Sequence, residues 1–215
     1  MSRTRIKFCG LRRKQDLECA VALGVDAVGF VMVPASKRCL SLNQAAKLRE
    51  RVPAFVNVVT LLMDAPARDV RAVIKAVQPD LLQFHGNETA EFCASFGLPY
   101  IKAVAMSGPV DLARFARRYR GSRGLLLDSH APGQMGGSGT AFDWTVATPT
   151  SMPLILAGGL NAQNVGKGIA QVRPYAVDVS SGIELQPGVK DVQRMRAFVD
   201  AVARADRAWQ RKNDG

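Results

Sequence analysis

Two neighbouring stretches near the C-terminus end in small residues whose backbone and hydroxyl groups could hold an anion. The apolar runs 154–157 and 176–179 are followed by small residues, namely Gly158, Gly159, Ser180, Ser181 and Gly182. Small side chains at a strand end let backbone N–H groups approach a phosphate closely. Ordinary tight turns also favour glycine and serine, but two such endings in tandem favour a phosphate site.

Asp128 is the residue best placed to act as an acid. It ends the apolar run 125–128 and precedes the glycine-rich stretch 129–139, which has no helical pattern. A carboxyl group that is partly desolvated at a strand end is expected to have a raised pKa and could serve as a general acid. A helix cap is the alternative, and the residues that follow Asp128 disfavour it.

Cys9 could act as a general base or a nucleophile, because it follows the extended run 5–8 and precedes Gly10. A cysteine in an apolar strand is most often a small buried hydrophobic residue. Base catalysis would require the thiol pKa to fall from ~8.5 toward neutrality, and both interpretations stay open. Lys7 is not expected to assist, because neighbouring residues along a strand face opposite sides.

Three further side chains follow expected strands. Arg38 presents a planar fork that suits a carboxylate or phosphate, although a solvent-exposed loop arginine is the more common situation. His85 could be a base or a ligand, but a histidine satisfied by loop backbone is expected. Asp178 is expected either to bind a substrate hydroxyl or amine, or to hold the loop after its strand in shape.

Strand and helix patterns alternate about eight times along the chain, at intervals of about 20–30 residues. The expected strands are 5–8, 27–33, 54–63, 81–84, 99–104, 124–127, 154–157 and 176–179. Helices are expected between them, one of them with Ser41 as its N-cap, and a last helix over 190–209. This alternation predicts an α/β fold with a parallel sheet, and eight repeats favour a closed (βα)8 TIM barrel, one domain over residues 1–215. No GxGxxG motif follows the first strand, which disfavours a dinucleotide-binding sheet.

The barrel expectation brings the candidate residues together. In such barrels catalytic residues lie at the carboxyl ends of the strands, and the loops after strands seven and eight commonly form a phosphate site. Cys9, Arg38, Asp128 and Asp178 all fall at or just after such ends. The sequence therefore predicts a thiol, two carboxylates, a guanidinium and an anion-binding pair of loops at one face.

Composition restricts the class of protein. The chain has 215 residues, of which 47% are hydrophobic and 22% charged, as in an ordinary soluble globular protein. No apolar run approaches the ~20 residues that span a membrane, and the N-terminus has no signal-peptide core, so we expect a cytoplasmic protein. Four widely spaced cysteines and two histidines argue against a zinc site or a disulfide framework.

The formal net charge of +11 raises the possibility of nucleic-acid binding. The basic residues are nevertheless dispersed and fall mostly on expected helices, without an aromatic RNA-binding motif or zinc-finger spacing. We therefore expect solvated outer faces, together with a positive field that favours encounter with an anionic substrate.

Taken together, the motifs resemble those of phosphoribosylanthranilate isomerases. The matching segments, in chain order, are KFCGL (7–11), DAVGFV and SKR (26–31 and 36–38), LQFHG (82–86), LLLDS (125–129), GGSGTAFDW (136–144), LAGGLNAQNV (156–165), VDVSSGIE (177–184) and PGVKD (187–191). Each motif alone is weak, whereas the ordered combination over almost the whole chain is highly specific.

The resemblance implies a (βα)8 barrel that catalyses an Amadori rearrangement of N-(5-phosphoribosyl)anthranilate in tryptophan biosynthesis, without a metal or organic cofactor. By matching position, Asp128 would be the general acid and Cys9 the general base. Arg38 would hold the anthranilate carboxylate, Asp178 would line the sugar, and the loops at 158–159 and 180–182 would bind the phosphate. The implied partner is a small phosphorylated substrate, with neither nucleic acid nor membrane, and the chain would be a monomer or a homodimer.

Two positions depart from the family pattern. Lys37 stands where the family usually has proline, which is expected to loosen the loop that carries Arg38. Thr140 stands where the family usually has lysine, so an anion contact from that position would be lost.

A related barrel that isomerises a histidine-pathway aminoaldose phosphate is the alternative function. It would need a second phosphate site and a pair of aspartates ending strands one and five, where this chain has Cys9 and the pair 104–105, Val-Ala. A non-enzymatic nucleic-acid binder is a third hypothesis, motivated by the net charge alone.

Overall fold

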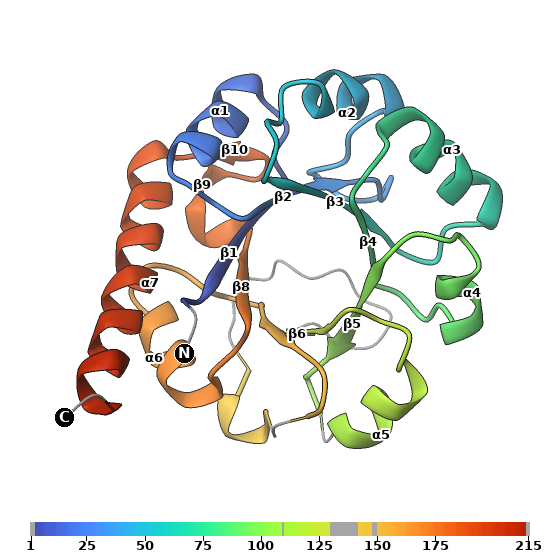
Figure 1. Ribbon diagram of the computed structural model, residues 1–215. Helices are drawn as coiled ribbons and strands as arrows, with labels where there is room; N and C mark the ends of the chain where they lie inside the picture. The colour runs from blue at the N-terminus through green and yellow to red at the C-terminus, as the bar shows by residue number, and fades with distance from the viewer. Residues whose placement is uncertain (1–2, 109, 130–141, 148–149, 214–215) are drawn as a thin grey trace.

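Eight parallel strands close into a barrel, each hydrogen-bonded to the next in chain order and β8 to β1, in a computed structural model (Figure 1). The structure describes residues 3–108, 110–129, 142–147 and 150–213. The strands are β1 Arg5–Cys9, β2 Ala27–Val31, β3 Asn57–Leu62, β4 Leu81–Phe84, β5 Tyr100–Ala105, β6 Leu125–Asp128, β7 Leu154–Leu156 and β8 Ala176–Val179. The predicted closed parallel barrel is confirmed.

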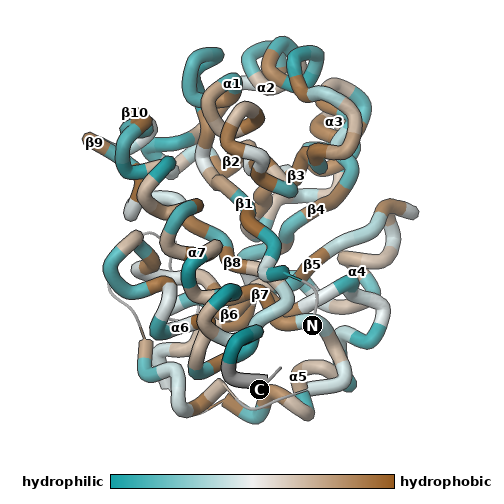
Figure 2. The backbone as a smooth tube through the Cα atoms, turned by 60° about the vertical axis from the view of Figure 1, so that its left-hand side comes forward, coloured by the Kyte–Doolittle hydropathy of each residue, from teal (hydrophilic) through white to brown (hydrophobic). Residues whose placement is uncertain are grey.

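Helices form the outer ring around these strands (Figure 1). They are α1 Lys14–Ala22, α2 Leu42–Arg49, α3 Ala67–Val77, α4 Ala90–Ala94, α5 Leu112–Arg118, α6 Val165–Val172 and α7 Val192–Asn213, with 3₁₀ turns η1 Trp144–Val146 and η2 Ser181–Ile183. The last helix, α7, packs against both α6 and α1 and so closes the ring. Hydrophobic and hydrophilic residues alternate along the helices (Figure 2), as expected for helices with one side on the barrel.

Local sequence signals set several of the helix ends. Ser41 caps α2 as expected, because its hydroxyl accepts from the Gln44 backbone while the Gln44 side chain accepts from the Ser41 backbone. The expectation of a helix from residue 190 is wrong, because Val189–Lys190 is strand β10, paired in a hairpin with β9, Glu184–Gln186. The helix begins at Val192, and the preceding residue, Asp191, caps it, because the Asp191 carboxylate accepts a hydrogen bond from the Arg194 backbone.

The two faces of each strand have different surroundings. Residues that point outward, such as Phe8, pack against the helices, and the Phe8 ring meets Phe198 of α7 edge-on at 6.1 Å. In β5 to β8 the inward residues away from the carboxyl ends are apolar, for example Ile101 and Leu126. At the carboxyl ends of β1, β6 and β8 the inward residues include Cys9, Asp128 and Asp178, which places chemistry at that end.

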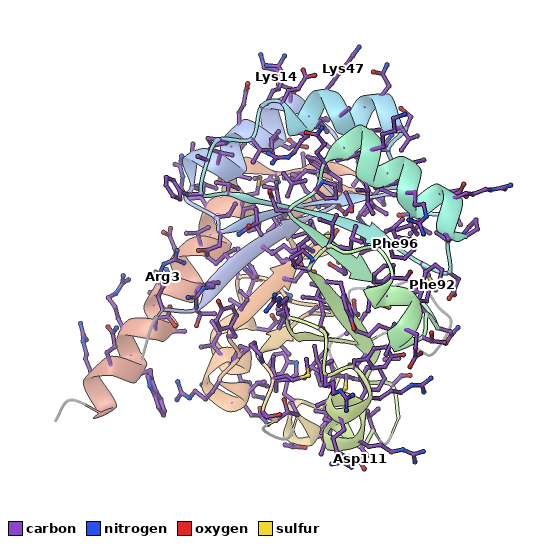
Figure 3. The ribbon with its side chains drawn as sticks, turned by 45° about the vertical axis from the view of Figure 1, so that its right-hand side comes forward. Arg3, Lys14, Lys47, Phe92, Phe96 and Asp111 are labelled. Carbon is purple, nitrogen blue, oxygen red and sulfur yellow. The ribbon has the colours of Figure 1, made fainter. Side chains whose placement is uncertain are left out.

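The basic side chains lie largely on the outer helices. Lys14 and Lys47, on α1 and α2, extend away from the molecule in Figure 3. The solvated outer faces inferred from the dispersed charge therefore agree with the structure. Over the described ranges, none of the helices is both long and apolar enough to cross a membrane.

Candidate active site

One pocket opens at the carboxyl ends of the barrel strands and collects most of the residues singled out in the sequence. Its lining includes nine of them: Cys9, Arg38, His85, Asp128, Asp178, Gly158, Gly159, Ser180 and Ser181. Gln83 and Ser36 also line it, together with apolar side chains of β2 and β3 such as Val31 and Leu61. The pocket therefore combines titratable groups, small-residue loops and an apolar wall.

Lys7 and Cys9 share the inward face of β1, because residues two apart along a strand point to the same side. The expectation that Lys7 points away from Cys9 is therefore wrong. The Lys7 ammonium lies 3.0 Å from each carboxylate oxygen of Asp178 on the adjacent strand β8, and both side chains are more than nine-tenths buried. Parallel pairing sets this contact, since Lys7 stands directly opposite Asp178 in the register.

Gly29 on β2 makes room for the inward side chains of Lys7 and Cys9 on β1. A Cβ atom at this position would lie 2.8 Å from the Cys9 sulfur and 3.1 Å from Cε of Lys7. Those distances are shorter than van der Waals contact, so any larger residue would displace the thiol or the amine. The absence of a side chain at Gly29 therefore allows Cys9 and Lys7 to take their positions in the site.

The buried charges shift one another's pKa. Burial raises the pKa of the Cys9 thiol, while the nearby Lys7 ammonium works to lower it and Asp178 adds to the rise. Burial also raises the pKa of Asp178, against the opposing effect of Lys7. For Lys7 itself burial alone would lower the pKa, yet the attraction of Asp178 and Cys9 together raises it.

Asp128 ends β6 and lies beside His85, which follows β4. The imidazole Nε2 is 3.6 Å from a carboxylate oxygen of Asp128, and its Nδ1 is 3.2 Å from the amide nitrogen of Gln83. When that amide donates to Nδ1, the neutral ring carries its proton on Nε2, the nitrogen that faces Asp128. Loop backbone was expected around His85. The structure places two side chains of the site, Gln83 and Asp128, beside the two ring nitrogens.

Arg38 lies at the pocket rim and is held by Glu184 of β9. Its Nε and Nη2 donate to the two carboxylate oxygens at 2.9 and 2.7 Å, and the arginine side chain is 14% exposed. The loop before it is hydrogen-bonded even with Lys37 in place of proline, since the Arg38 backbone donates to the Ser36 hydroxyl.

Lys190 of β10 completes this cluster. Its ammonium lies 2.8 Å from Glu184 and also donates to the backbone carbonyls of Cys9 and Ser180. Although burial would raise the pKa of Glu184, Arg38 and Lys190 together lower it. Sequence reasoning did not single out Glu184 or Lys190, although both stand in quoted motifs, VDVSSGIE and PGVKD.

The loops after β7 and β8 depend on glycine. Gly158 and Gly159 have φ of 76° and 64°, and a Cβ on Gly158 would lie 2.5 Å from the backbone nitrogen of Ser129. The Asn164 side chain fixes the next peptide by donating to the Gly159 carbonyl at 2.9 Å. Gly182 does not line the pocket, but a Cβ there would clash with the Leu160 carbonyl, so this glycine lets the two loops pack together.

Part of the expected site falls outside the described residues. The glycine-rich stretch lies there from residue 130 to 139, and so does Thr140. Within the described ranges, no three His, Cys, Asp or Glu side chains are grouped as metal ligands would be. What the pocket presents is an acid, a thiol, a guanidinium and two loops suited to an anion, drawn from several strands.

Comparison with known proteins gives a consistent result. Residues 6–201 match the family model for N-(5'-phosphoribosyl)anthranilate (PRA) isomerase. The chain is 49% identical over 207 residues to the N-(5'-phosphoribosyl)anthranilate isomerase of Stenotrophomonas maltophilia (strain R551-3), covering 95% of each chain.

Solved structures agree with the sequence relatives. The phosphoribosyl anthranilate isomerase of Thermus thermophilus superposes with a TM-score of 0.85 at 34% identity, over 94% of this chain and 99% of that one. A second isomerase, solved in complex with reduced 1-(o-carboxyphenylamino)-1-deoxyribulose 5-phosphate, superposes with a TM-score of 0.82 at 35% identity, over 93% and 98%.

Proposed function

The chain belongs to the N-(5'-phosphoribosyl)anthranilate isomerase family, and we propose how its own residues catalyse the aldose–ketose isomerisation of that family. The substrate is N-(5-phosphoribosyl)anthranilate and the product is 1-(2-carboxyphenylamino)-1-deoxyribulose 5-phosphate, an Amadori rearrangement within tryptophan biosynthesis. The observation that carries the proposal is that Cys9 of β1 and Asp128 of β6 line one pocket. Opening an aminofuranose needs an acid at the ring oxygen, and moving a C–H proton needs a base at the neighbouring carbon.

Asp128 is the general acid. Its carboxyl proton passes to the furanose ring oxygen as the bond from C1 to that oxygen breaks, which leaves a Schiff base between C1 and the anthranilate nitrogen. The carboxylate that results faces Nε2 of His85 at 3.6 Å. A proton on that nitrogen stabilises the new negative charge, which makes the proton transfer more favourable.

Cys9 is the general base. Its thiolate takes the proton from C2, the C–H electron pair forms the C1–C2 double bond, and the π pair of the C1–N bond returns to the nitrogen. The resulting enolamine tautomerises to the ketose. Burial raises the pKa of this thiol, so the thiolate needs a nearby positive charge. The Lys7 ammonium supplies it from the same face of β1, and Asp178 holds that ammonium in place.

Arg38 and the two glycine- and serine-rich loops anchor the ends of the substrate. Arg38 binds the anthranilate carboxylate, while residues 158–159 and 180–182 bind the phosphate, and Asp178 lines the sugar between them. Anchors at both ends spend remote binding energy on aligning C1 and C2 with the acid and the base. The pocket lining supports this arrangement, since these residues and the two catalytic groups share one pocket, apart from Gly182, which shapes the loop.

Turnover of N-(5-phosphoribosyl)anthranilate by the purified protein, followed by the loss of substrate fluorescence, tests the proposal. We expect Asp128→Asn and Cys9→Ser each to lower kcat/KM by roughly 10²–10⁴-fold. Cys19→Ser is the matched control, because Cys19 is a half-buried cysteine of α1 that does not line the pocket. Folded Asp128 and Cys9 variants with the parent activity would overturn the assigned roles.

The alternative reactions receive less support. The histidine-pathway isomerase would need aspartates at the ends of β1 and β5, where the structure has Cys9 and Ala105. The comparisons also point to the anthranilate enzyme. We further propose that residues 1–215 fold as one domain, that the protein acts in the cytoplasm as a monomer or homodimer, and that it binds no nucleic acid.

A further inference from the structure

Lys190 is a buried cation that does not line the pocket itself but contacts the backbone of two residues that do, Cys9 and Ser180. Its side chain is fully buried, and its ammonium has three close acceptors: the Cys9 carbonyl at 2.6 Å, the Ser180 carbonyl at 3.1 Å and the Glu184 carboxylate at 2.8 Å. Burial lowers the pKa of Lys190, against the opposing effect of Glu184. A neutral amine has only two N–H groups, however, so three acceptors at these distances match the charged form, which has three.

Glu184 joins this ammonium to Arg38. One carboxylate oxygen accepts from Lys190 and from Nε of Arg38, and the other accepts from Nη2 of Arg38. The backbone of Gly188 also donates to Glu184 at 3.1 Å. The carboxylate is therefore held on several sides and fixes the plane of the guanidinium.

The arginine keeps part of its fork for a ligand. A guanidinium has five N–H donors, and Glu184 takes one from Nε and one from Nη2. Among the described residues, no group accepts a hydrogen bond from Nη1, and Arg38 lines the pocket. The plane set by Glu184 thus decides which way the remaining donors point.

Lys190 also determines the net charge of the group formed by Arg38, Glu184 and Lys190. Arg38 and Glu184 cancel, and so do Lys7 and Asp178, which form a separate buried pair. The charge of Lys190 therefore leaves the cluster of Arg38, Glu184 and Lys190 at +1. A neutral arginine–glutamate pair would attract a carboxylate far less than this cluster does.

We propose that Glu184 and Lys190 are positioning residues for recognition of the substrate carboxylate: Glu184 aims the arginine fork, and Lys190 keeps the cluster cationic while joining the strand ends of Cys9 and Ser180. This inference rests on the proposed function, in which Arg38 holds the anthranilate carboxylate. Neither residue touches the reacting atoms, and both act through Arg38 and the backbone.

A second buried lysine–glutamate pair shows what a purely structural role would look like. Lys102 lies 3.2 Å from Glu88, both are at least 97% buried, and the ammonium also donates to the Gly86 carbonyl. Neither residue lines the pocket, and no arginine within the described ranges forms an ion pair with Glu88. Lys102→Met is therefore the matched control for Lys190→Met.

The test compares two ligands that differ in one group. The reduced product analogue carries the aromatic carboxylate, and its counterpart made from aniline lacks it. The dissociation constant of the aniline counterpart divided by that of the carboxylate analogue measures how strongly the protein recognises the carboxylate. A larger ratio means stronger recognition. We expect Glu184→Gln and Lys190→Met to reduce this ratio by roughly ten- to a hundredfold, as for lost hydrogen bonds to charged groups. Lys102→Met should lower the melting temperature and leave the ratio unchanged.

A double-variant comparison tests whether Glu184 acts through Arg38. In an Arg38→Met background, Glu184→Gln should change the ratio little further, because the residue through which it acts is gone. Folded Glu184→Gln protein with the parent ratio would overturn the inference while leaving the isomerase function intact. If Lys190→Met does not fold, the Glu184→Gln ratio decides alone. Failure of the parent protein to bind the reduced analogue would instead overturn the proposed function.

Discussion

The Lys7 ammonium lies 3.0 Å from both carboxylate oxygens of Asp178, so a buried ion pair joins β1 to β8 one layer below Cys9. Removing one partner of such a pair is costly, because an uncompensated charge is left inside the protein. Here the pair also sets the electrostatic environment of the thiol, since Lys7 works to lower the pKa of Cys9 and Asp178 to raise it.

Replacing Lys7 should therefore shift the pH dependence of turnover. In the proposed mechanism Cys9 must be deprotonated, so we expect kcat/KM to rise with pH through the pKa of this thiol. Lys7→Met removes the positive charge that lowers this pKa, so the rising limb should move to higher pH. Asp178→Asn removes a charge that raises the same pKa and should move the limb to lower pH. A pH profile of kcat/KM for both variants checks the opposite signs; parallel profiles with equal midpoints would contradict the role of Lys7.

Enlarging Gly29 should disturb the base without touching the substrate. The added Cβ of Gly29→Ala would meet the Cys9 sulfur at 2.8 Å, so the thiol must move. Misplacing a catalytic group by about 1 Å can cost about 10²-fold in rate, and we expect a loss of that order in kcat. Gly108→Ala is the control, because a Cβ there meets nothing within 4 Å. Steady-state kinetics of both variants settle the comparison.

The packing of the loops after β7 and β8, the proposed phosphate site, should depend on Gly182. Gly182→Ala places a methyl group against the Leu160 carbonyl and forces the loops apart. We expect a loss of ~1–3 kcal/mol in unfolding free energy, typical of overpacking, together with weaker competitive inhibition by inorganic phosphate. The control is Gly166→Ala in α6, where the new Cβ would lie 3.8 Å from the Cβ of Ala205, an ordinary van der Waals contact. An unchanged phosphate inhibition constant would separate Gly182 from the phosphate site.

Removing the cap of α2 should affect stability alone. Ser41→Ala deletes the hydroxyl that accepts from the Gln44 backbone, and the loss of such a cap costs about 1 kcal/mol. Ser41 is exposed and does not line the pocket, so kcat/KM should stay at the parent value. Urea unfolding followed by circular dichroism, with the kinetic assay alongside, measures both. A fall in activity would show that α2 affects the loop that carries Arg38.

Local pattern alone determined the architecture. The alternation of apolar strand runs with helical spacing depends on neighbours in the chain, and it predicted the closed parallel barrel that the structure has. The same rule placed Cys9, Asp128 and Asp178 at one end, because parallel strands in a barrel all finish on the same side. The hairpin of β9 and β10 escaped prediction, since its strands are three and two residues long and too short for a period to show.

The tertiary structure decided which side chains meet. Lys7 and Asp178 are 171 residues apart, Arg38 and Glu184 146, and Lys190 and the Cys9 carbonyl 181. The first contact follows from strand register, since a one-residue shift between β1 and β8 would turn Lys7 or Asp178 to the other face. The other two follow from how the loops and the β9–β10 hairpin pack at the barrel end. The sequence by itself thus determined the barrel and the face where the chemistry lies. Register and loop packing decided that the thiol has an ammonium beside it and that the arginine is aimed by a buried carboxylate.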